Sequence, residues 1–179
     1  MVYVHLAEGF EEIEALTVVD LLRRAGIEVN TVSIGDLLVT GAHGISVKAD
    51  MLIDDARYSQ CQMIVLPGGM PGSKNLENCQ LLQDMIDQFN QEEKYIAAIC
   101  AAPMILGHKD LLKNRKAVIY SGMEKHLGKK AIVVPDKAVV DGHFITGKGP
   151  GCAIDFALKI ISVLKGENKA NSIKEELLY

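Results

Sequence analysis

The sequence contains no block of lysine or arginine residues, and it has no apolar run near the ~20 residues that cross a bilayer. Its formal net charge is −4 and its isoelectric point is about 5.7. We therefore expect no nucleic-acid partner and no membrane segment. The opening residues, MVYVHLAEGF, also lack the basic stretch of a signal peptide.

Cysteine pairs are missing as well. The four cysteines stand at positions 61, 79, 100 and 152, and no two of them form a CxxC pair. The spacing typical of a zinc site or a redox pair is therefore absent, and no metal is predicted. Reduced thiols in the cytoplasm are the simplest expectation.

The composition is that of an ordinary globular protein, with 49% apolar and 23% charged residues. A chain of 179 residues can bury a sizeable core without disulfides. No repeat, low-complexity segment or linker divides it. We predict one domain over residues 1–179.

Strand and helix patterns alternate from the start of the chain. A short apolar run at residues 2–7 precedes a helical pattern at 11–25 and a second strand at 28–34. These short connections favour a right-handed crossover and a parallel sheet. Apolar residues keep helical spacing on this first helix and are expected to face the core: Ile13, Leu16, Val19 and Leu22.

The alternation continues to the end of the chain. Strands are predicted at residues 37–40, 45–48, 62–66, 95–99, 117–120, 131–134, 138–140 and 144–146, the first two as a hairpin. Helices are predicted at 76–90, 102–112, 150–165 and 168–177, with a short helical piece near 123–127. The pattern predicts an α/β fold, a doubly wound sandwich with a mostly parallel sheet.

Candidate functional residues follow the carboxyl ends of predicted strands, where ligands bind in open parallel sheets. They are Glu11, Glu12 and Glu14 after the first strand, Pro67-Gly68-Gly69 after the strand at 62–66, Cys100 after the strand at 95–99, and Tyr120-Ser121-Gly122 after the next. Glu11 and Glu12 are expected to be solvated acids of a first helical turn.

Cys100 is the residue around which these features gather. It stands between the strand YIAAI and a helix opened by Ala-Ala-Pro. A helix N-terminus favours a thiolate over a thiol. Free cysteines are also often buried structural residues, and this stretch alone fits both roles equally.

Two other features could act on Cys100. The N–H groups of Gly69 and Ala101 could form an oxyanion hole, although a glycine turn is more often a plain turn. Glu14 could face inward and, when protonated, donate a hydrogen bond to a thiolate. An isolated glutamate is more often a surface charge.

A histidine base for Cys100 is not evident. The five histidines stand at positions 5, 43, 108, 126 and 143, and the sequence places none of them beside Cys100. Each is expected to be structural or solvated. The cysteine–histidine dyad of a hydrolase is therefore not predicted.

Four stretches together resemble the ThiJ/PfpI superfamily, most of all the branch that contains the Parkinson-disease-associated deglycase and its bacterial relatives. They are AEGFEEIEALTVVDLLRRAGIEV from residue 7, IVLPGGMPGSKNL from 64, AAICAAPMIL from 97 and GKGPGCAIDFALKII from 147. They span nearly the whole chain, and they are specific as a set.

This resemblance implies a flavodoxin-like α/β/α sandwich of the class I glutamine-amidotransferase type. It implies a homodimer formed partly by the helix that ends near Arg24. It also implies a nucleophile elbow at Cys100, Glu14 as the protonated partner of its thiolate, and oxyanion N–H groups from Gly69 and Ala101. The residues that it places along the pocket are Gly68, Tyr120 and Pro150.

The chain departs from other branches of the superfamily. Protease-like members carry histidine directly after the nucleophile, where this chain has Ala101. The amidotransferase relatives use a G-x-C-x-G elbow and a later His-x-Glu, and neither occurs here. Relatives in the deglycase branch often carry glycine in place of Ala102 and arginine in place of His43.

Four functions are compatible with these residues. The leading hypothesis is a cofactor-independent glyoxalase or deglycase, in which Cys100 attacks small reactive carbonyls, methylglyoxal-type 2-oxoaldehydes or their adducts. The second is an oxidative-stress sensor or redox chaperone with an oxidisable Cys100. The third is a cysteine amidase or peptidase, which lacks an evident base. The fourth is a binding module without catalysis.

Overall fold

The computed structural model describes residues 1–179 and is built on a seven-stranded sheet with strand order β10-β11-β7-β6-β1-β2-β5. Every neighbouring pair of strands is parallel except β10 with β11. The strands are β1 (Val2–Leu6), β2 (Val29–Ser33), β5 (Met51–Leu52), β6 (Met63–Leu66), β7 (Tyr95–Ile99), β10 (Ala138–Asp141) and β11 (Phe144–Gly147). The predicted mostly parallel α/β sandwich is confirmed.

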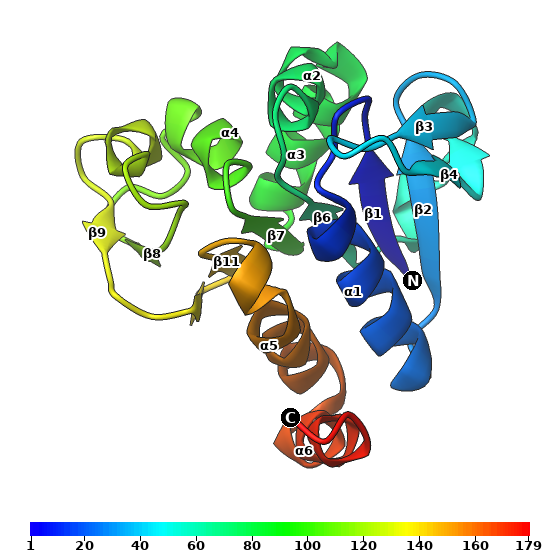
Figure 1. Ribbon diagram of the computed structural model, residues 1–179. Coiled ribbons are helices and arrows are strands. Elements are labelled where there is room, and N and C mark those ends of the chain that lie inside the picture. Colours follow the sequence, from blue (N-terminus) through cyan, green and yellow to red (C-terminus); the bar gives the residue numbers. More distant parts are fainter.

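Helices cover both faces of this sheet (Figure 1). One layer contains α1 (Glu12–Arg24), α5 (Ala153–Lys165) and α6 (Glu167–Glu176). The other contains α2 (Gly72–Asn78), α3 (Gln80–Gln91) and α4 (Pro103–His108). Short 3₁₀ helices are η1 (Ile53–Asp55), η2 (Tyr58–Gln60), η3 (Glu124–Leu127) and η4 (Pro150–Cys152). No helix combines the length and the apolar character that a membrane crossing requires.

Two small sheets lie outside the main one. The antiparallel hairpin of β3 (Leu38–Thr40) and β4 (Ser46–Lys48) confirms the predicted hairpin. β8 (Lys116–Ala117) pairs in parallel with β9 (Ile132–Val133).

The central strand β1 shows how the sequence builds two cores. All five of its residues are buried, and successive side chains of a strand point to opposite faces. Val2, Val4 and Leu6 join the core under α1 and α5, whereas Tyr3 joins the core under α3 and α4. Burial on both faces explains why this strand is a continuous apolar run.

The order of the strands creates a switch point between β1 and β6. From β1 the chain builds outward to β2 and β5, and it then returns to the other side of β1 to add β6, β7 and β11. Ligands of open α/β sheets bind at the carboxyl ends of strands at such a point. The segments that follow β1, β6 and β7 therefore meet there.

Several predicted elements have different bounds in the structure, and three of the differences have a clear local cause or extent. The helix predicted at 76–90 is two helices, because Cys79 is extended (φ −81°, ψ 101°) and separates α2 from α3. The helix predicted at 102–112 ends at His108, shortly before Asp110 adopts a positive φ of 55°. The strand predicted at 117–120 pairs only at Lys116–Ala117.

The buried face of α1 also differs from the prediction. Val19 and Leu22 are buried as predicted, but Ile13 and Leu16 are 56% and 36% exposed. The face turned toward the sheet instead includes Glu14, which is fully buried. Apolar spacing alone does not reveal a carboxyl group on an inner face.

Candidate active site

Cys100 occupies a strained turn between β7 and α4. Its φ is +63°, in the left-handed region that residues other than glycine seldom adopt. The surroundings hold it there, since its N–H donates to the Gly147 carbonyl at 3.0 Å and its own carbonyl accepts from the Tyr120 N–H at 2.9 Å. Such strain concentrates at functional sites, and this geometry is the one expected of a nucleophile elbow.

Glu14 lies in the first turn of α1, and its carboxyl group lies close to Cys100. Its Oε2 accepts from the Gly68 N–H at 2.7 Å, and its Oε1 is buried without a hydrogen-bond partner. Burial raises the pKa of this carboxyl to about 7, against the opposing effect of hydrogen bonds from Cys100 and Gly68. The carboxyl therefore holds its proton to a far higher pH than an exposed glutamate does.

The cysteine and the glutamate are close neighbours across Gly68. A Cβ atom on Gly68 would lie 2.5 Å from Glu14 Oε2 and 2.6 Å from Cys100 Cβ. No other residue type fits at this position. Gly69 has a φ of +87°, and a Cβ there would lie 2.5 Å from the Glu11 backbone nitrogen. The two glycines therefore do more than punctuate a turn: they let the loop approach the site closely.

The Cys100 thiol does not ionise easily while Glu14 is charged. Burial and the negative charge of Glu14 raise the pKa of the thiol to about 12, whereas the N–H groups of Gly69 and Ala101 lower it. The helix that follows, α4, is only six residues long and begins at Pro103. That its N-terminus favours the thiolate stays a prediction.

The two acids consequently titrate as a pair. The first proton leaves the pair near neutral pH, and the second leaves only at high pH. The one remaining proton resides on the group whose anion is less well stabilised. The sulfur faces the N–H groups of Gly69 and Ala101, and the carboxylate accepts from the Gly68 N–H and the Cys100 thiol. A thiolate beside a protonated Glu14 stays a prediction.

Tyr120 and Pro150 lie near one another on the edge of this site. The Tyr120 backbone is bonded to Cys100, and its half-exposed ring lies 3.3 Å from where a Cβ on Gly149 would stand. Gly149 directly precedes Pro150. The role of Gly68, Tyr120 and Pro150 in lining a substrate pocket stays a prediction.

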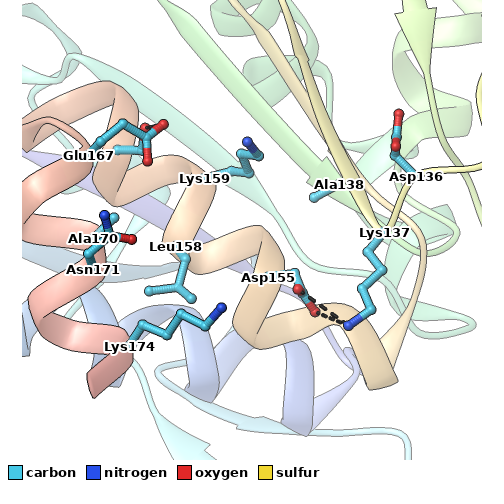
Figure 2. A pocket seen from close by; sticks show the side chains of 11 residues that line it. Asp136, Lys137, Ala138, Asp155, Leu158, Lys159, Glu167, Ala170, Asn171 and Lys174 are labelled. Carbon is cyan, nitrogen blue, oxygen red and sulfur yellow. Dashed lines mark hydrogen bonds and ion pairs between the residues drawn. The ribbon is translucent and has the colours of Figure 1, made fainter. Parts of the chain in front are cut away.

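Cavities of 310 to 410 Å³ occur elsewhere on the molecule, and neither Cys100 nor Glu14 lines these. One of 340 Å³ lies along α5 and α6 (Figure 2). There the Lys137 ammonium pairs with Asp155 at 3.2 Å, and the Tyr179 hydroxyl donates to Asp155 at 2.7 Å. These contacts attach the C-terminal residue to α5 and involve none of the candidate catalytic groups.

The five histidines all have hydrogen-bond partners away from Cys100. His5 bonds Tyr58, His43 bonds Glu12, His143 bonds Asn90, and His108 and His126 bond each other. None of these bonds joins a histidine to Cys100, so the contacts give no support to a cysteine–histidine dyad.

Glu11 and Glu12 are not the solvated acids that the sequence predicts. The Glu12 side chain is 5% exposed and accepts from the His43 N–H at 2.8 Å and from His43 Nδ1 at 2.9 Å. Although burial alone would raise its pKa, these hydrogen bonds bring the Glu12 pKa to about 2. The carboxylate fastens the β3–β4 hairpin to α1, a contact between distant residues that no local pattern signals.

Comparison with known proteins agrees with the fold. A profile of the DJ-1/PfpI family matches residues 1–163. The DJ-1 homolog A of Arabidopsis thaliana is 37% identical over 180 residues, which cover 99% of this chain and 46% of that protein. The chain thus spans about half the length of that relative.

Two further relatives match along most of their own length. The glutathione-independent glyoxalase DJR-1.2 of Caenorhabditis elegans is 31% identical over 170 residues, covering 95% of this chain and 91% of that protein. The structure of an oxidized DJ-1 from Toxoplasma gondii superposes with a TM-score of 0.94 at 38% identity, covering 99% of this chain and 97% of the other.

Fold and site together define a flavodoxin-like α/β protein with a cysteine at a strained elbow and a buried glutamate beside it. The chain belongs to the DJ-1/PfpI family.

The buried Glu14 should make stability depend on pH. Its usual pKa of 4.5 is raised to about 7 in the fold, so the native state binds the extra proton between these values. The stabilisation is fully present below about pH 4.5 and is lost as the pH rises through 7. The free energy of unfolding of wild type minus that of Glu14→Gln should fall by roughly 3 kcal/mol over this window.

Urea unfolding at several pH values measures this difference. The difference in unfolding free energy between the two proteins is needed because the buried His5 also makes stability depend on pH. Its pKa is lowered to about 4, so its contribution changes in the opposite sense. His5 is present in both proteins, so its contribution cancels. A difference that stays flat from pH 4.5 to 8 would show that Glu14 ionises normally in the fold.

Proposed function

We propose that this protein is a cofactor-independent enzyme that converts methylglyoxal-type 2-oxoaldehydes, or their adducts with amines and thiols, into 2-hydroxy acids. The supporting observation is the buried Cys100–Glu14 pair beside the N–H groups of Gly69 and Ala101. The Caenorhabditis elegans relative that is named a glutathione-independent glyoxalase adds support.

The reaction begins with attack of the Cys100 sulfur on the aldehyde carbon. A carbon–sulfur bond forms, and the carbonyl oxygen becomes the oxyanion of a hemithioacetal. The N–H groups of Gly69 and Ala101, which already act on the sulfur, are placed to stabilise this oxygen. Glu14 supplies the proton that neutralises it, because its raised pKa keeps that proton available near neutral pH.

Glu14 then moves a proton between the two adjacent carbons. As a carboxylate it removes the hydrogen of the former aldehyde carbon, and it returns the proton to the neighbouring carbon. The hydroxyl proton of the hemithioacetal passes to the former ketone oxygen, so that the first carbon becomes a carbonyl and the second an alcohol. The product is a thioester of the hydroxy acid on Cys100. Water cleaves that thioester, which releases lactate from methylglyoxal and regenerates the thiol. The sum of these steps is addition of one water molecule, with no net oxidation or reduction.

Oxidation of Cys100 is the second candidate function. A sulfinate would find hydrogen-bond donors in a protonated Glu14 and in the N–H groups of Gly69 and Ala101. The superposed structure from Toxoplasma gondii is described as that of an oxidized protein. Both functions use the same sulfur, so one protein can serve both.

Cys100→Ser should abolish production of lactate from methylglyoxal, because serine lacks the nucleophilic sulfur. Glu14→Gln should lower the rate by about 10²–10⁴-fold, the range typical of a lost general acid–base. Cys79→Ser is the matched control, since Cys79 is partly exposed but lies in the break between α2 and α3. Lactate is measured enzymatically with purified protein.

Equal rates in wild type and Cys100→Ser would refute the glyoxalase proposal. A wild-type protein that forms no lactate, but gains oxygen selectively at Cys100 under mild peroxide, would favour the second function. Peptide mapping by mass spectrometry separates that outcome from scattered oxidation over Cys61, Cys79 and the methionines.

We also propose that the chain forms a homodimer through the exposed side of α1. Ile13 and Leu16 are 56% and 36% exposed on this helix. Ile45, which is 54% exposed, lies beside them because its N–H donates to Glu12 Oε1 at 3.4 Å. An apolar group of this kind on a helix is typical of an interface.

Ile13→Lys should weaken the dimer at least about tenfold, because an unpaired charge would be buried in the contact. Sedimentation velocity over a concentration series measures the association. Ile132→Lys is the control, since Ile132 is similarly exposed but lies on β9. A monomeric wild type, or equal association in both variants, would contradict the proposal.

A further inference from the structure

A group of three polar side chains lies on the side of the molecule where α2, α4 and η3 meet. Glu77 comes from α2, His108 is the last residue of α4, and His126 lies in η3. Gly107 makes this approach possible, because the His126 carbonyl lies where its Cβ would stand. The close packing of η3 on α4 therefore brings the two imidazoles together.

The hydrogen bonds of this group fix which ring nitrogens face one another. His108 Nδ1 bonds Glu77 Oε1, and an ionised carboxylate can only accept, so Nδ1 carries a proton. His108 Nε2 then faces His126 Nδ1 at 3.0 Å. In either charge state of the pair, one proton lies between these two nitrogens.

We propose that His108 Nε2 and His126 Nδ1 form a binding site for a divalent transition-metal ion of the class that prefers imidazole, with zinc as its representative. The metal takes the place of the single proton between the rings. Two nitrogens that bind one tetrahedral zinc ion at about 2.0–2.1 Å stand roughly 3.3 Å apart. The observed 3.0 Å is close to that separation, and small rotations of the partly exposed rings close the difference.

Glu77 is the positioning residue of this site. A metal-binding histidine usually donates its other ring N–H to a carboxylate, which fixes the tautomer and makes the ligand more basic. Glu77 does this for His108, and its second oxygen is held by Lys74 Nζ at 2.6 Å. The carboxylate is therefore anchored before any metal arrives.

Protons balance in both charge states of the histidine pair. In the neutral pair, His126 exchanges its Nδ1 proton for one on Nε2, so no proton is released. In the protonated pair, the shared proton leaves to solvent as the metal binds. The remaining coordination positions of the ion face outward and are taken by water.

A bound ion would tie η3 to the end of α4, the helix that follows the nucleophile elbow. The segment between Tyr120 and His126 is already linked by backbone bonds, from Met123 to Tyr120 and from His126 to Met123. The metal would therefore also restrain Tyr120, whose backbone bonds Cys100.

Calorimetric titration with zinc ions tests this site in wild type and in single variants with confirmed folds. His126→Gln and His108→Gln should each weaken binding at least tenfold, because one of two ligands is lost. Glu77→Gln should weaken it about tenfold, the lower end of the effect of removing such a carboxylate. Long-range nitrogen NMR of the histidine rings should show shifts at His108 Nε2 and His126 Nδ1.

Two control variants separate this site from other groups that could hold zinc. His43→Gln removes a residue of the Glu11, Glu12 and His43 group, whose ligand atoms lie within 4.8 Å of one another. Cys100→Ser removes the reactive thiol. Both variants should bind zinc as wild type does. Binding that is lost in either control and kept in His126→Gln, or no saturable binding up to about 1 mM zinc, would overturn the proposal.

Discussion

The hydrogen bond from the Gly68 N–H to Glu14 is the contact on which the site depends. It places a fully buried carboxyl of α1 against the loop that follows β6, at the point where Cys100 leaves β7. A buried carboxylate with a single donor is costly in free energy. The protein avoids this cost when Glu14 keeps its proton, which its raised pKa favours.

Three strands contribute to this arrangement, and each contributes a different kind of group. The segment after β1 provides the acid, the loop after β6 provides backbone N–H groups without side chains, and the turn after β7 provides the sulfur at a positive φ. The switch point between β1 and β6 brings them together. In the proposed reaction, the acid, the nucleophile and the oxyanion donors would all come from one end of one sheet.

The sequence predicts the strands of the sheet centre and the position of Cys100 at a strand end because these features are local. The inward position of Glu14 is implied only by the family resemblance, since local spacing makes an isolated glutamate a surface charge. Apolar runs identify β1, β6 and β7, and residue order places the candidate groups at their ends. The two-residue strand β5 is too short to produce a pattern.

Contacts between distant residues explain what the sequence does not predict. Glu12 is buried because His43 and Ile45 bond it across the hairpin, and α2 and α3 separate because Cys79 is extended. Burial and then the negative charge of Glu14, 86 positions away in the chain, raise the pKa of Cys100.

The most direct test of the claim that Cys100 and Glu14 share a proton is the pH dependence of Cys100 alkylation. The rate of reaction with iodoacetamide is measured against pH in wild type and in Glu14→Gln. A thiolate beside a protonated Glu14 predicts a midpoint near the first deprotonation of the pair, about 7, and a midpoint at least one unit higher in the variant. Midpoints at or above the unperturbed value of about 8.5 in both proteins would contradict it.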